Sequence, residues 1–447
     1  MIILLISALL GVALLALEIF KLRAFMMPLM LLSFMGILAG TVIQWGMSEN
    51  ILNQNMMMMD AFALKSIAIL TILASFWLVL QHKNIQATGN GADLYALIAF
   101  SFCGALLMTN FTNMVMLFLA IEILSIPLYV LAASNRGNRI SNEAGFKYFL
   151  LGSVASAILL FGIALIYGAT ASFDLYVIHD FIAANSTNYL VLTGMGMILT
   201  GFAFKISAAP FHFWAPDVYQ GAPTPITGWM ATVVKGAAIL GMYRLFAGAF
   251  ESGLGFFNGA IAIMVMLTLI IANGMATLQA NVKRMLAFSG VSHAGFLLAC
   301  ILIPGFNSQP LMFYVLSYGI ASLLSFYVIQ SVGQQIGEEL HAFDGLAQKS
   351  PFTAAIMSLA LLSMAGIPPL AGFFGKYYVI SGLMGHYTWL TIIMILTSVV
   401  AMYYYLKVIF AMYGKNNNGH DFADGNRWAL ILGGIALIAL FAFSTLI

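Results

Sequence analysis

The segment FAFKISAAPFHFWAPDVYQGAPTPITGWMATVVK, residues 202–235, decides the fold of this chain. An apolar helix enters it with Lys205 at its end, four prolines interrupt the backbone, and a second apolar helix then buries Lys235. Interrupted backbone at membrane depth is tolerated only where it packs inside protein or lines a wet cavity. A lysine at the bilayer centre costs ~2.5–3.5 kcal/mol on insertion scales. We interpret the segment as part of an ion path; the alternative is that both lysines reach water from helix ends.

The composition places the chain among polytopic membrane proteins and excludes several other classes. Its 447 residues are 62% hydrophobic and 7% charged, whereas soluble domains average about 25% charged. Cys103 and Cys300 are isolated and form no CxxC pair, so neither a zinc site nor an iron–sulfur ligand set is supported. The sequence has no phosphate-binding glycine motif of either common type and no basic run, so we expect no nucleotide or nucleic-acid binding. The first apolar run precedes its basic residues and is expected to be a retained helix rather than a cleaved signal.

Apolar runs long enough to span a bilayer predict an all-α fold with about 14 transmembrane helices. The runs lie at 2–20, 25–45, 62–80, 93–108, 111–133, 144–169, 189–207, 224–247, 254–277, 284–303, 308–333, 352–381, 388–412 and 428–446. Prolines predict that the seventh and twelfth of these helices are broken.

Loop charges predict the orientation of the chain in the membrane. One set of alternate loops carries eleven of the 17 basic residues: Lys21, Arg23, Lys83, Arg136, Arg139, Lys147, Lys283, Arg284, Lys349, Lys415 and Arg427. The opposite loops carry Arg244 at a helix end together with Glu49, Asp60, Asp174, Asp180 and Glu251. The positive-inside rule places the first set in the cytoplasm. This pattern fits a bacterial plasma (inner) membrane, with both termini on the periplasmic side.

Polar residues inside the predicted helices indicate an internal repeat. Glu122 and His293 are 171 residues apart, as are Lys205 and Lys376, and Lys235 precedes Lys407 by 172. The same offset superposes helices four to eight on helices nine to thirteen. Because five is an odd number, the second unit would have inverted topology, as in many transporters. The predicted organisation is 1–92 for flanking helices 1–3, 93–247 for the first repeat, 254–412 for the second, and 413–447 for a loop and helix 14.

Four ionisable residues at membrane depth are the candidates for proton translocation: Glu122, Lys205, Lys235 and Lys376. A buried carboxylate must be neutral or paired. A glutamate–lysine pair can hold both charges, and separating the pair would allow the lysine to release its proton. The alternative is a static buried ion pair.

Three further residues are secondary relay candidates. His293 has hydroxyl neighbours in Ser289 and Ser292, and it can change charge near physiological pH. Lys407 follows three tyrosines, and for it a relay role and a lysine that reaches water are equally compatible with the sequence. His212 lies with Asp217 in the broken segment, where it could cap a half-helix or hold water.

Three motifs resemble the antiporter-like membrane subunits of proton-pumping NADH:quinone oxidoreductase, respiratory complex I. They are IEILSIPLYVL at 121–131, PFHFWAPDVYQGAPTP at 210–225 and GIPPLAGFFGKYYV at 366–379. The DVYQGAP segment and a lysine at 376 resemble the N-type subunits, also called subunit 2, more than the M or L types.

The resemblance implies a proton channel with two half-paths joined at mid-membrane. It implies that Glu122 modulates Lys205, that Lys235 connects the halves, and that Lys376 belongs to the exit half. It further implies that this chain binds no cofactor, since NADH, FMN, iron–sulfur clusters and quinone belong to partner subunits. The expected partners are other complex I membrane subunits, including related antiporter-like ones, and the lipid bilayer.

Two other functions remain open at the level of sequence. One is an Mrp-like cation/proton antiporter without a redox arm, although Glu122 is the only carboxylate deep in the repeats and sodium prefers several oxygen ligands. The other is a passive structural subunit, which the four intact candidate residues disfavour.

Overall fold

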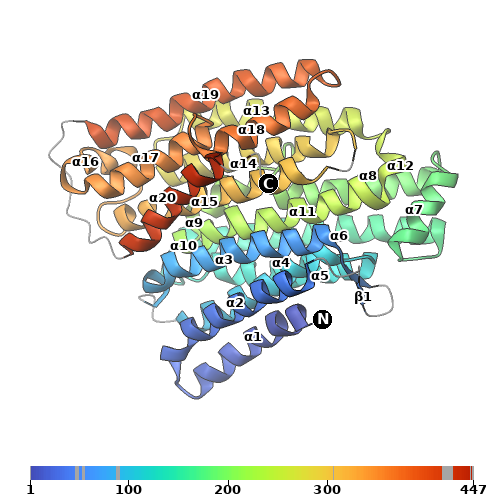
Figure 1. Ribbon diagram of the computed structural model, residues 1–447, viewed down its shortest axis with the longest axis horizontal. Helices are drawn as coiled ribbons and strands as arrows, with labels where there is room; N and C mark the ends of the chain where they lie inside the picture. The colour runs from blue at the N-terminus through green and yellow to red at the C-terminus, as the bar shows by residue number, and fades with distance from the viewer. Residues whose placement is uncertain are drawn as a thin grey trace.

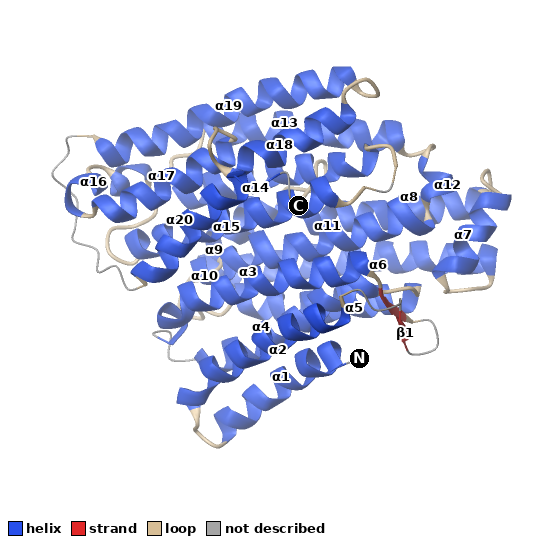
Figure 2. Cartoon of the chain, viewed as in Figure 1, coloured by secondary structure: helices blue, strands red, loops and turns tan. Residues whose placement is uncertain are grey.

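The computed structural model describes residues 2–45, 50–52, 56–86, 91–305, 307–414, 426–442 and 444. Within them the chain is a stack of long helices that run side by side (Figures 1 and 2). Eleven helices of this described part are long and apolar enough to cross a membrane. Four shorter apolar helices of the same part (Ile3–Ile19, Leu175–Ala184, Pro351–Ala365 and Arg427–Ala442) fall below that length. The all-α class is as expected, whereas a total of fourteen spans stays a prediction.

Apart from the short helix Trp214–Gly221, which lies between two of them, the main helices follow the predicted apolar runs. In the first half they are α1 (Ile2–Ile19), α2 (Met26–Gln44), α3 (Ala61–Gln86), α4 (Gly91–Asn110), α5 (Met114–Ala132), α6 (Arg139–Thr170), α8 (Tyr189–Ile206), α9 (Trp214–Gly221), α10 (Thr224–Trp229) and α11 (Lys235–Arg244). In the second half they are α13 (Asn258–Thr277), α14 (Val282–Ala299), α15 (Gln309–Gly333), α17 (Pro351–Ala365), α18 (Ala371–Leu383), α19 (Thr388–Tyr413) and α20 (Arg427–Ala442).

Several short elements were not predicted from the sequence. They are α7 (Leu175–Ala184), α12 (Glu251–Leu254), α16 (Leu346–Lys349), a hairpin of β1 (Asn50–Leu52) and β2 (Met57–Met59), three 3₁₀ turns (Arg23–Phe25, Cys300–Leu302, Leu340–Phe343) and two π turns (Met230–Val234, Leu245–Ala249). In addition, α6 begins five residues before its predicted start, because the Asn138 side chain caps it by accepting a hydrogen bond from the Ile140 N–H at 2.9 Å.

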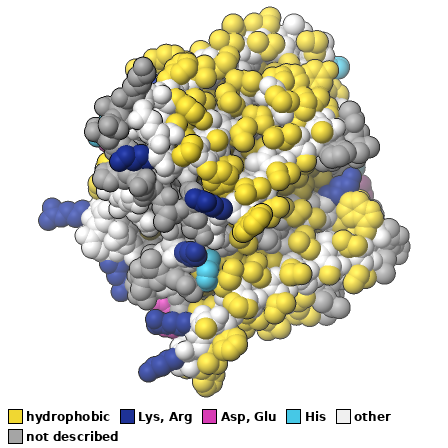
Figure 3. Space-filling view, turned by 60° about the vertical axis from the view of Figure 1, so that its left-hand side comes forward, with side chains coloured by type: hydrophobic (Ala, Val, Ile, Leu, Met, Phe, Trp, Pro, Cys, Tyr) yellow, Lys and Arg dark blue, Asp and Glu magenta, His cyan; other side chains and the backbone are white. Residues whose placement is uncertain are grey.

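Polar contacts tie the helix ends together at two opposite ends of the stack. We call one the basic end: there Asp217 of α9 binds Lys147 of α6 and Arg284 of α14, and Asn426 donates to the Val79 carbonyl. Lys and Arg side chains gather toward this end, while hydrophobic side chains cover the broad face beside it (Figure 3).

We call the other end the acidic end. There Asp60, before α3, binds Arg244 at the end of α11, and Asn113 forms a β-bridge with Asp174. The basic and acidic sets of alternate loops therefore lie at opposite ends of the stack. Glu49 and Lys415 lie outside the described residues.

The centre of the stack is formed by α10–α11, α14 and α15. Every residue of α14 except Arg284 is buried, and nearly all of α15 is buried as well. The flanking helices α1 and α2 instead keep many apolar side chains exposed, as expected for surfaces that face lipid. The buried central helices are those that carry Lys235 and His293, so these polar groups lie in the interior.

Candidate functional site

Lys205 lies in the last turn of α8 and is 7% exposed. Its Nζ donates to Ser125 Oγ at 2.7 Å and to Tyr129 Oη at 3.4 Å, both on α5. Its partners are therefore neutral hydroxyl groups. A buried ammonium held by neutral acceptors keeps the desolvation cost that a carboxylate partner would offset.

Glu122 lies on the same face of α5 as Ser125 and Tyr129, one turn before Ser125. Its Oε1 is buried and has no hydrogen-bond partner among the described residues. A direct Glu122–Lys205 ion pair, which the sequence suggested, is absent from the ion pairs of that part of the chain. The Ser125 hydroxyl occupies the position at the Lys205 ammonium that the sequence assigned to the carboxylate.

Lys235 is 2% exposed and begins α11 directly after the π turn Met230–Val234. Its Nζ donates to the Gly290 carbonyl of α14 at 2.7 Å and lies 5.8 Å from the centroid of the Tyr219 ring. Single π turns inside α-helices are frequent at functional sites because they displace the helix locally. Here the turn immediately precedes the lysine.

Lys376 belongs to α18 and is 7% exposed. Its Nζ reaches back across the interruption of the helix and donates to the carbonyl of Ala365, the last residue of α17, at 3.0 Å. It also lies 5.3 Å from the centroid of the Phe296 ring. A cation at a helix C-terminus is favoured by the unpaired carbonyls and the helix dipole.

The two interruptions have the same backbone form. Both α8 and α17 end at a residue in the left-handed region, Ser207 with φ +60° and Gly366 with φ +85°. These two residues are 159 positions apart, so the spacing of 171 between the lysines does not align the interruptions. Lys205 precedes one interruption and Lys376 follows the other. Lys376 binds the last carbonyl of the helix that stops there, whereas Lys205 lies in the last turn of its helix and binds hydroxyl groups of α5.

His293 lies at the centre of α14 and is 5% exposed. Its Nδ1 is 2.8 Å from Tyr314 Oη and its Nε2 is 3.1 Å from Tyr405 Oη. The Tyr405 hydroxyl also contacts Ser289 Oγ. Both ring nitrogens are therefore connected to hydroxyl groups that can donate or accept, which is the arrangement a proton relay requires.

The other secondary candidates have fewer polar contacts. Lys407 is half-buried in α19, and the hydrogen bonds and ion pairs of the described chain do not include its side chain. His212 is 3% exposed, lies between α8 and α9, and has a buried Nδ1 without a partner in that same part of the chain. The structure brings neither residue into contact with the three lysines.

Three charged groups have partners that the sequence did not predict. Lys283 is 3% exposed and binds Glu338, although we assigned Lys283 to a basic loop. Asp60, assigned to an acidic loop, binds Arg244. Asp217 is held from both sides by Lys147 and Arg284 rather than serving as a free cap. For Lys283 the available signal was Asn281, a helix-capping residue that places Lys283 in the first turn of α14.

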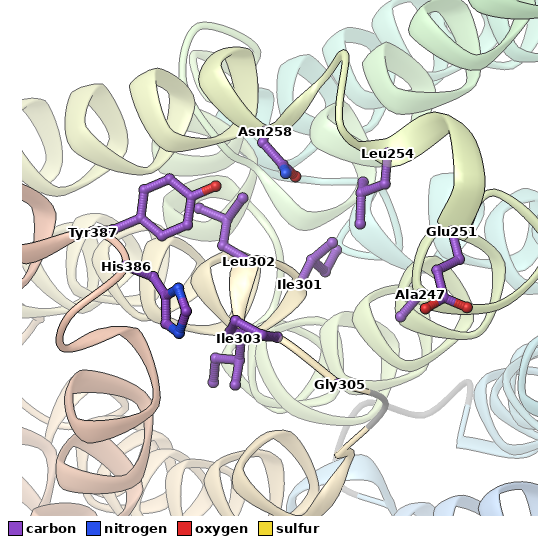
Figure 4. Close-up of a pocket in the computed structure, with 11 residues that line it drawn as sticks. Ala247, Glu251, Leu254, Asn258, Ile301, Leu302, Ile303, Gly305, His386 and Tyr387 are labelled. Atoms are coloured by element: carbon purple, nitrogen blue, oxygen red, sulfur yellow. The ribbon is translucent and has the colours of Figure 1, made fainter. Parts of the chain in front are cut away.

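Two cavities open at the ends of the stack. The acidic-end cavity has a volume of 420 Å³ and lies between Glu251, Asn258 and the His386–Tyr387 pair, over the Ile301–Gly305 segment (Figure 4). The basic-end cavity has a volume of 570 Å³ and is lined by polar side chains from α15, the α5–α6 loop and the start of α14. The described residues contain no group of three or more His, Cys, Asp or Glu side chains placed to hold a metal ion.

Known proteins have sequences similar to that of this chain. Residues 112–401 match the family model described as NADH:quinone oxidoreductase/Mrp antiporter, TM. NADH-quinone oxidoreductase subunit N of Cytophaga hutchinsonii is 42% identical over 409 residues, which cover 90% of this chain and 88% of that protein. Subunit N of Flavobacterium psychrophilum is 40% identical, with 91% and 90% covered.

Solved structures have the same fold. A chain of respiratory complex I from Thermus thermophilus superposes with a TM-score of 0.85 and 33% identity, covering 99% of this chain and 98% of that one. A chain of the Mrp complex from a Dietzia species gives a TM-score of 0.87 at 20% identity, with 99% and 94% covered, which shows similarity of fold. The chain therefore belongs to the NADH:quinone oxidoreductase/Mrp antiporter family of multi-pass membrane proteins, with its subunit N relatives matching along nearly its whole length.

Proposed function

We propose that this chain is the N-type proton-translocating membrane subunit of an NADH:quinone oxidoreductase, and that Glu122, Lys205, Lys235 and Lys376 carry its proton path. One observation supports the path above all others. Three buried lysines lie beside helix interruptions or a π turn, and their ammonium groups bind hydroxyl and carbonyl oxygens rather than carboxylates. Among the described residues, no carboxylate forms an ion pair with any of the three ammonium groups.

Glu122 is suited to control Lys205. Glu122 lies one turn before Ser125 on the same face of α5, and Ser125 binds the Lys205 ammonium. Charges act on one another over several ångströms in a medium of low dielectric constant. A change in the charge of Glu122, or a shift of α5 against α8, would therefore load or unload Lys205.

His293 is proposed to join Lys235 to Lys376. The Lys235 ammonium binds Gly290, which lies one turn before His293 on α14. The Lys376 ammonium lies over Phe296, one turn after His293 on the same helix. His293 is thus midway between them, with Tyr314 and Tyr405 as hydroxyl partners.

We propose fourteen membrane spans, with residues 93–247 and 254–412 as inverted repeats of five helices whose seventh and twelfth spans are broken. The matched backbone form of the two interruptions supports this organisation. So do Asn113 and Asn281, which cap α5 and α14 and each form an isolated β-bridge. The basic end would face the cytoplasm of a bacterium, with both termini on the periplasmic side.

In this proposal the driving force comes from partner subunits. NADH, FMN, iron–sulfur clusters and quinone would be bound by those subunits, and this chain would bind none of them. It would assemble with other complex I membrane subunits, including related antiporter-like ones. The alternative of an Mrp-like antiporter is disfavoured because the Mrp chain is 20% identical, against about 40% for the subunit N relatives.

Substitution of Lys205 tests the proposal. Lys205→Ala should leave insertion and assembly intact and lower proton pumping per electron in inverted vesicles that oxidise NADH. Lys65→Ala is the matched control, because it removes a lysine from α3, which lies outside the path. An unchanged proton-to-electron ratio in the Lys205 variant would refute the proposed path.

A further inference from the structure

The basic-end cavity is lined by polar groups. It lies outside the proposed path of Glu122, Lys205, Lys235 and Lys376. It lies among the α5–α6 loop, the α9–α10 junction, the start of α14 and the end of α15. Uncharged amides supply much of its lining, namely Asn135, Asn138, Gln330 and Gln334. A cavity of 570 Å³ with these groups has the size and the polar partners that ordered water requires.

One ion pair forms part of the wall of this cavity. The Lys283 Nζ lies 3.2 Å from Glu338 Oε1 and also donates to the carbonyls of Ala222 at 2.7 Å and Gln220 at 3.2 Å. The Lys283 side chain is 3% exposed, whereas that of Glu338 is 23% exposed. Glu338 also accepts a hydrogen bond from Thr224 Oγ1 at 3.2 Å. The lysine is thus fixed in the wall, and the carboxylate is the member that water can reach.

Residues that line the basic-end cavity are adjacent to residues that contact Lys235. Gln220, whose carbonyl binds Lys283, directly follows Tyr219, whose ring lies 5.8 Å from the Lys235 ammonium. Along α14, Lys283 and Gly290 are seven residues apart, which corresponds to ~10 Å of helix. Gly290 is the residue that binds the Lys235 ammonium. A group titrating at Glu338 is therefore about two helical turns from the path.

The acidic-end cavity is made from the corresponding connections of the second five-helix unit. The α5–α6 loop and the α9–α10 junction line the basic-end cavity. The α14–α15 connection, at 301–305, and the α18–α19 connection, at His386 and Tyr387, line the acidic-end cavity (Figure 4). That cavity also contains Asn258, whose Oδ1 is buried without a partner in the described chain. In each five-helix unit, the corresponding pair of helix connections thus lines a polar cavity. The two cavities lie at opposite ends of the molecule.

We propose that Glu338 is the group that takes up protons at the basic end and that Lys283 is its positioning residue. This inference rests on the proposed function. The Glu338 carboxylate accepts a proton from water in the cavity, which removes its negative charge and breaks its ion pair with Lys283. The proton then passes to water on the interior side, and the regenerated carboxylate pairs with Lys283 again. No other reactant is consumed.

The experiment uses the assembled complex in inverted vesicles, with pumping and NADH oxidation measured together. Glu338→Gln should lower the proton-to-electron ratio to the level of Lys205→Ala, whereas Glu338→Asp should retain most of it. Glu339→Gln is the matched control, because it removes the same charge at the next position, which is exposed and does not line the cavity. Lys283→Met should lower the ratio and Lys283→Arg should preserve it.

A double variant separates proton uptake from a static ion pair. If Lys283 and Glu338 serve only to hold the fold, Lys283→Met combined with Glu338→Gln removes both charges and should restore pumping. If Glu338 takes up protons, the double variant should stay as low as Glu338→Gln. Restoration would overturn the inference. Normal pumping by Glu338→Gln alongside a defective Lys205→Ala would overturn it as well, while leaving the proposed function standing. Normal pumping by Lys205→Ala would refute the proposed function itself.

A second measurement tests whether water reaches the cavity. Gln334→Cys places a thiol on its wall, and both natural cysteines, Cys103 and Cys300, are buried. A charged, membrane-impermeant thiosulfonate added to the face that carries the basic end should label the new cysteine and lower pumping. The same reagent applied to the opposite face should do neither, and equal or absent labelling from the two faces would contradict the inference.

Discussion

Arg244→Met should be among the most destabilising single substitutions of a charged residue in this chain. The guanidinium is 8% exposed and joins three segments at the acidic end. Its Nε donates to the Phe111 carbonyl at 2.9 Å, and its Nη1 donates to the Thr109 carbonyl at 3.2 Å and to both Asp60 oxygens at 3.1 and 3.0 Å. Methionine preserves much of the side-chain volume and removes all of these bonds.

The magnitude follows from what each substitution leaves behind. Arg244→Met leaves the Asp60 carboxylate largely buried with only the Ala63 N–H, at 2.7 Å, as its hydrogen-bond donor. Breaking a buried pair in this way costs ~3–5 kcal/mol, and the partial exposure of Asp60 favours the lower value. Asp60→Asn costs less, ~1.5–3 kcal/mol, because an asparagine can still cap α3 and Arg244 keeps two carbonyl partners. Exposed pairs such as Lys147–Glu143 are worth only ~0.3–0.5 kcal/mol.

The assay is thermal unfolding of the purified chain in detergent, followed by the reaction of a fluorogenic thiol reagent with the buried Cys103 and Cys300. Scaling from smaller domains, 1 kcal/mol corresponds to about 1–2 °C for a chain of this length. Arg244→Met should therefore lower the midpoint by about 3–6 °C, Asp60→Asn by less, and the control Glu143→Gln by under about 1 °C. The double variant should show coupling between Asp60 and Arg244. Equal midpoints for Arg244→Met and Glu143→Gln would refute the reasoning.

The remaining predictions concern the proton path. Glu122→Gln should weaken pumping while Glu122→Asp largely preserves it, and equal pumping by the two variants would remove the role of charge. Gly372→Ala should lower pumping with little change in assembly, because its Cβ would overlap the backbone carbonyl of Ser363 and push α18, with Lys376, away from the end of α17. Gly259→Ala, in open space at the start of α13, is the control, and an equal effect of both substitutions would exclude the steric explanation.

The helices were predictable because their signal is long and local. Runs of about 20 apolar residues are required to span a bilayer, and the structure places long helices in most of the predicted runs. What the sequence did not reveal was local backbone detail set by tertiary packing. The π turns before Lys235 and after Arg244 have no residue signature of their own. The helix α7 is apolar but has only 10 residues, which is too short to be recognised as a span.

Candidate site residues were predictable because a charge inside an apolar run is costly, so a charged residue there is conspicuous. This signal finds Lys205, Lys235 and Lys376, and it cannot find Lys283, which follows a loop and is buried only because α9 and Glu338 cover it. Burial of a loop residue is a property of its neighbours in space. Conversely, the spacing of 171 between Lys205 and Lys376 indicated a repeat but not its alignment, because the two side chains approach similar helix ends from opposite sides of an interruption.

The groups that a charged side chain binds distinguish structural charges from candidate functional charges better than the type of residue does. The ion pairs described above lie at the two ends of the stack, where Arg244 binds Asp60, Lys283 binds Glu338, and Asp217 binds two cations. Inside the stack the lysines of the proposed path bind hydroxyl and carbonyl groups, and the ion pairs of the described residues include none of these lysines. A carboxylate partner would stabilise the charged form of a buried lysine and hold its proton. Neutral partners leave the proton exchangeable and make its position sensitive to a distant charge such as that of Glu122, because electrostatic interactions are stronger in a medium of low dielectric constant. The lack of direct counter-charges at these lysines, among the residues that the structure describes, is therefore the feature that most favours a conducting arrangement of the proposed path over a static one.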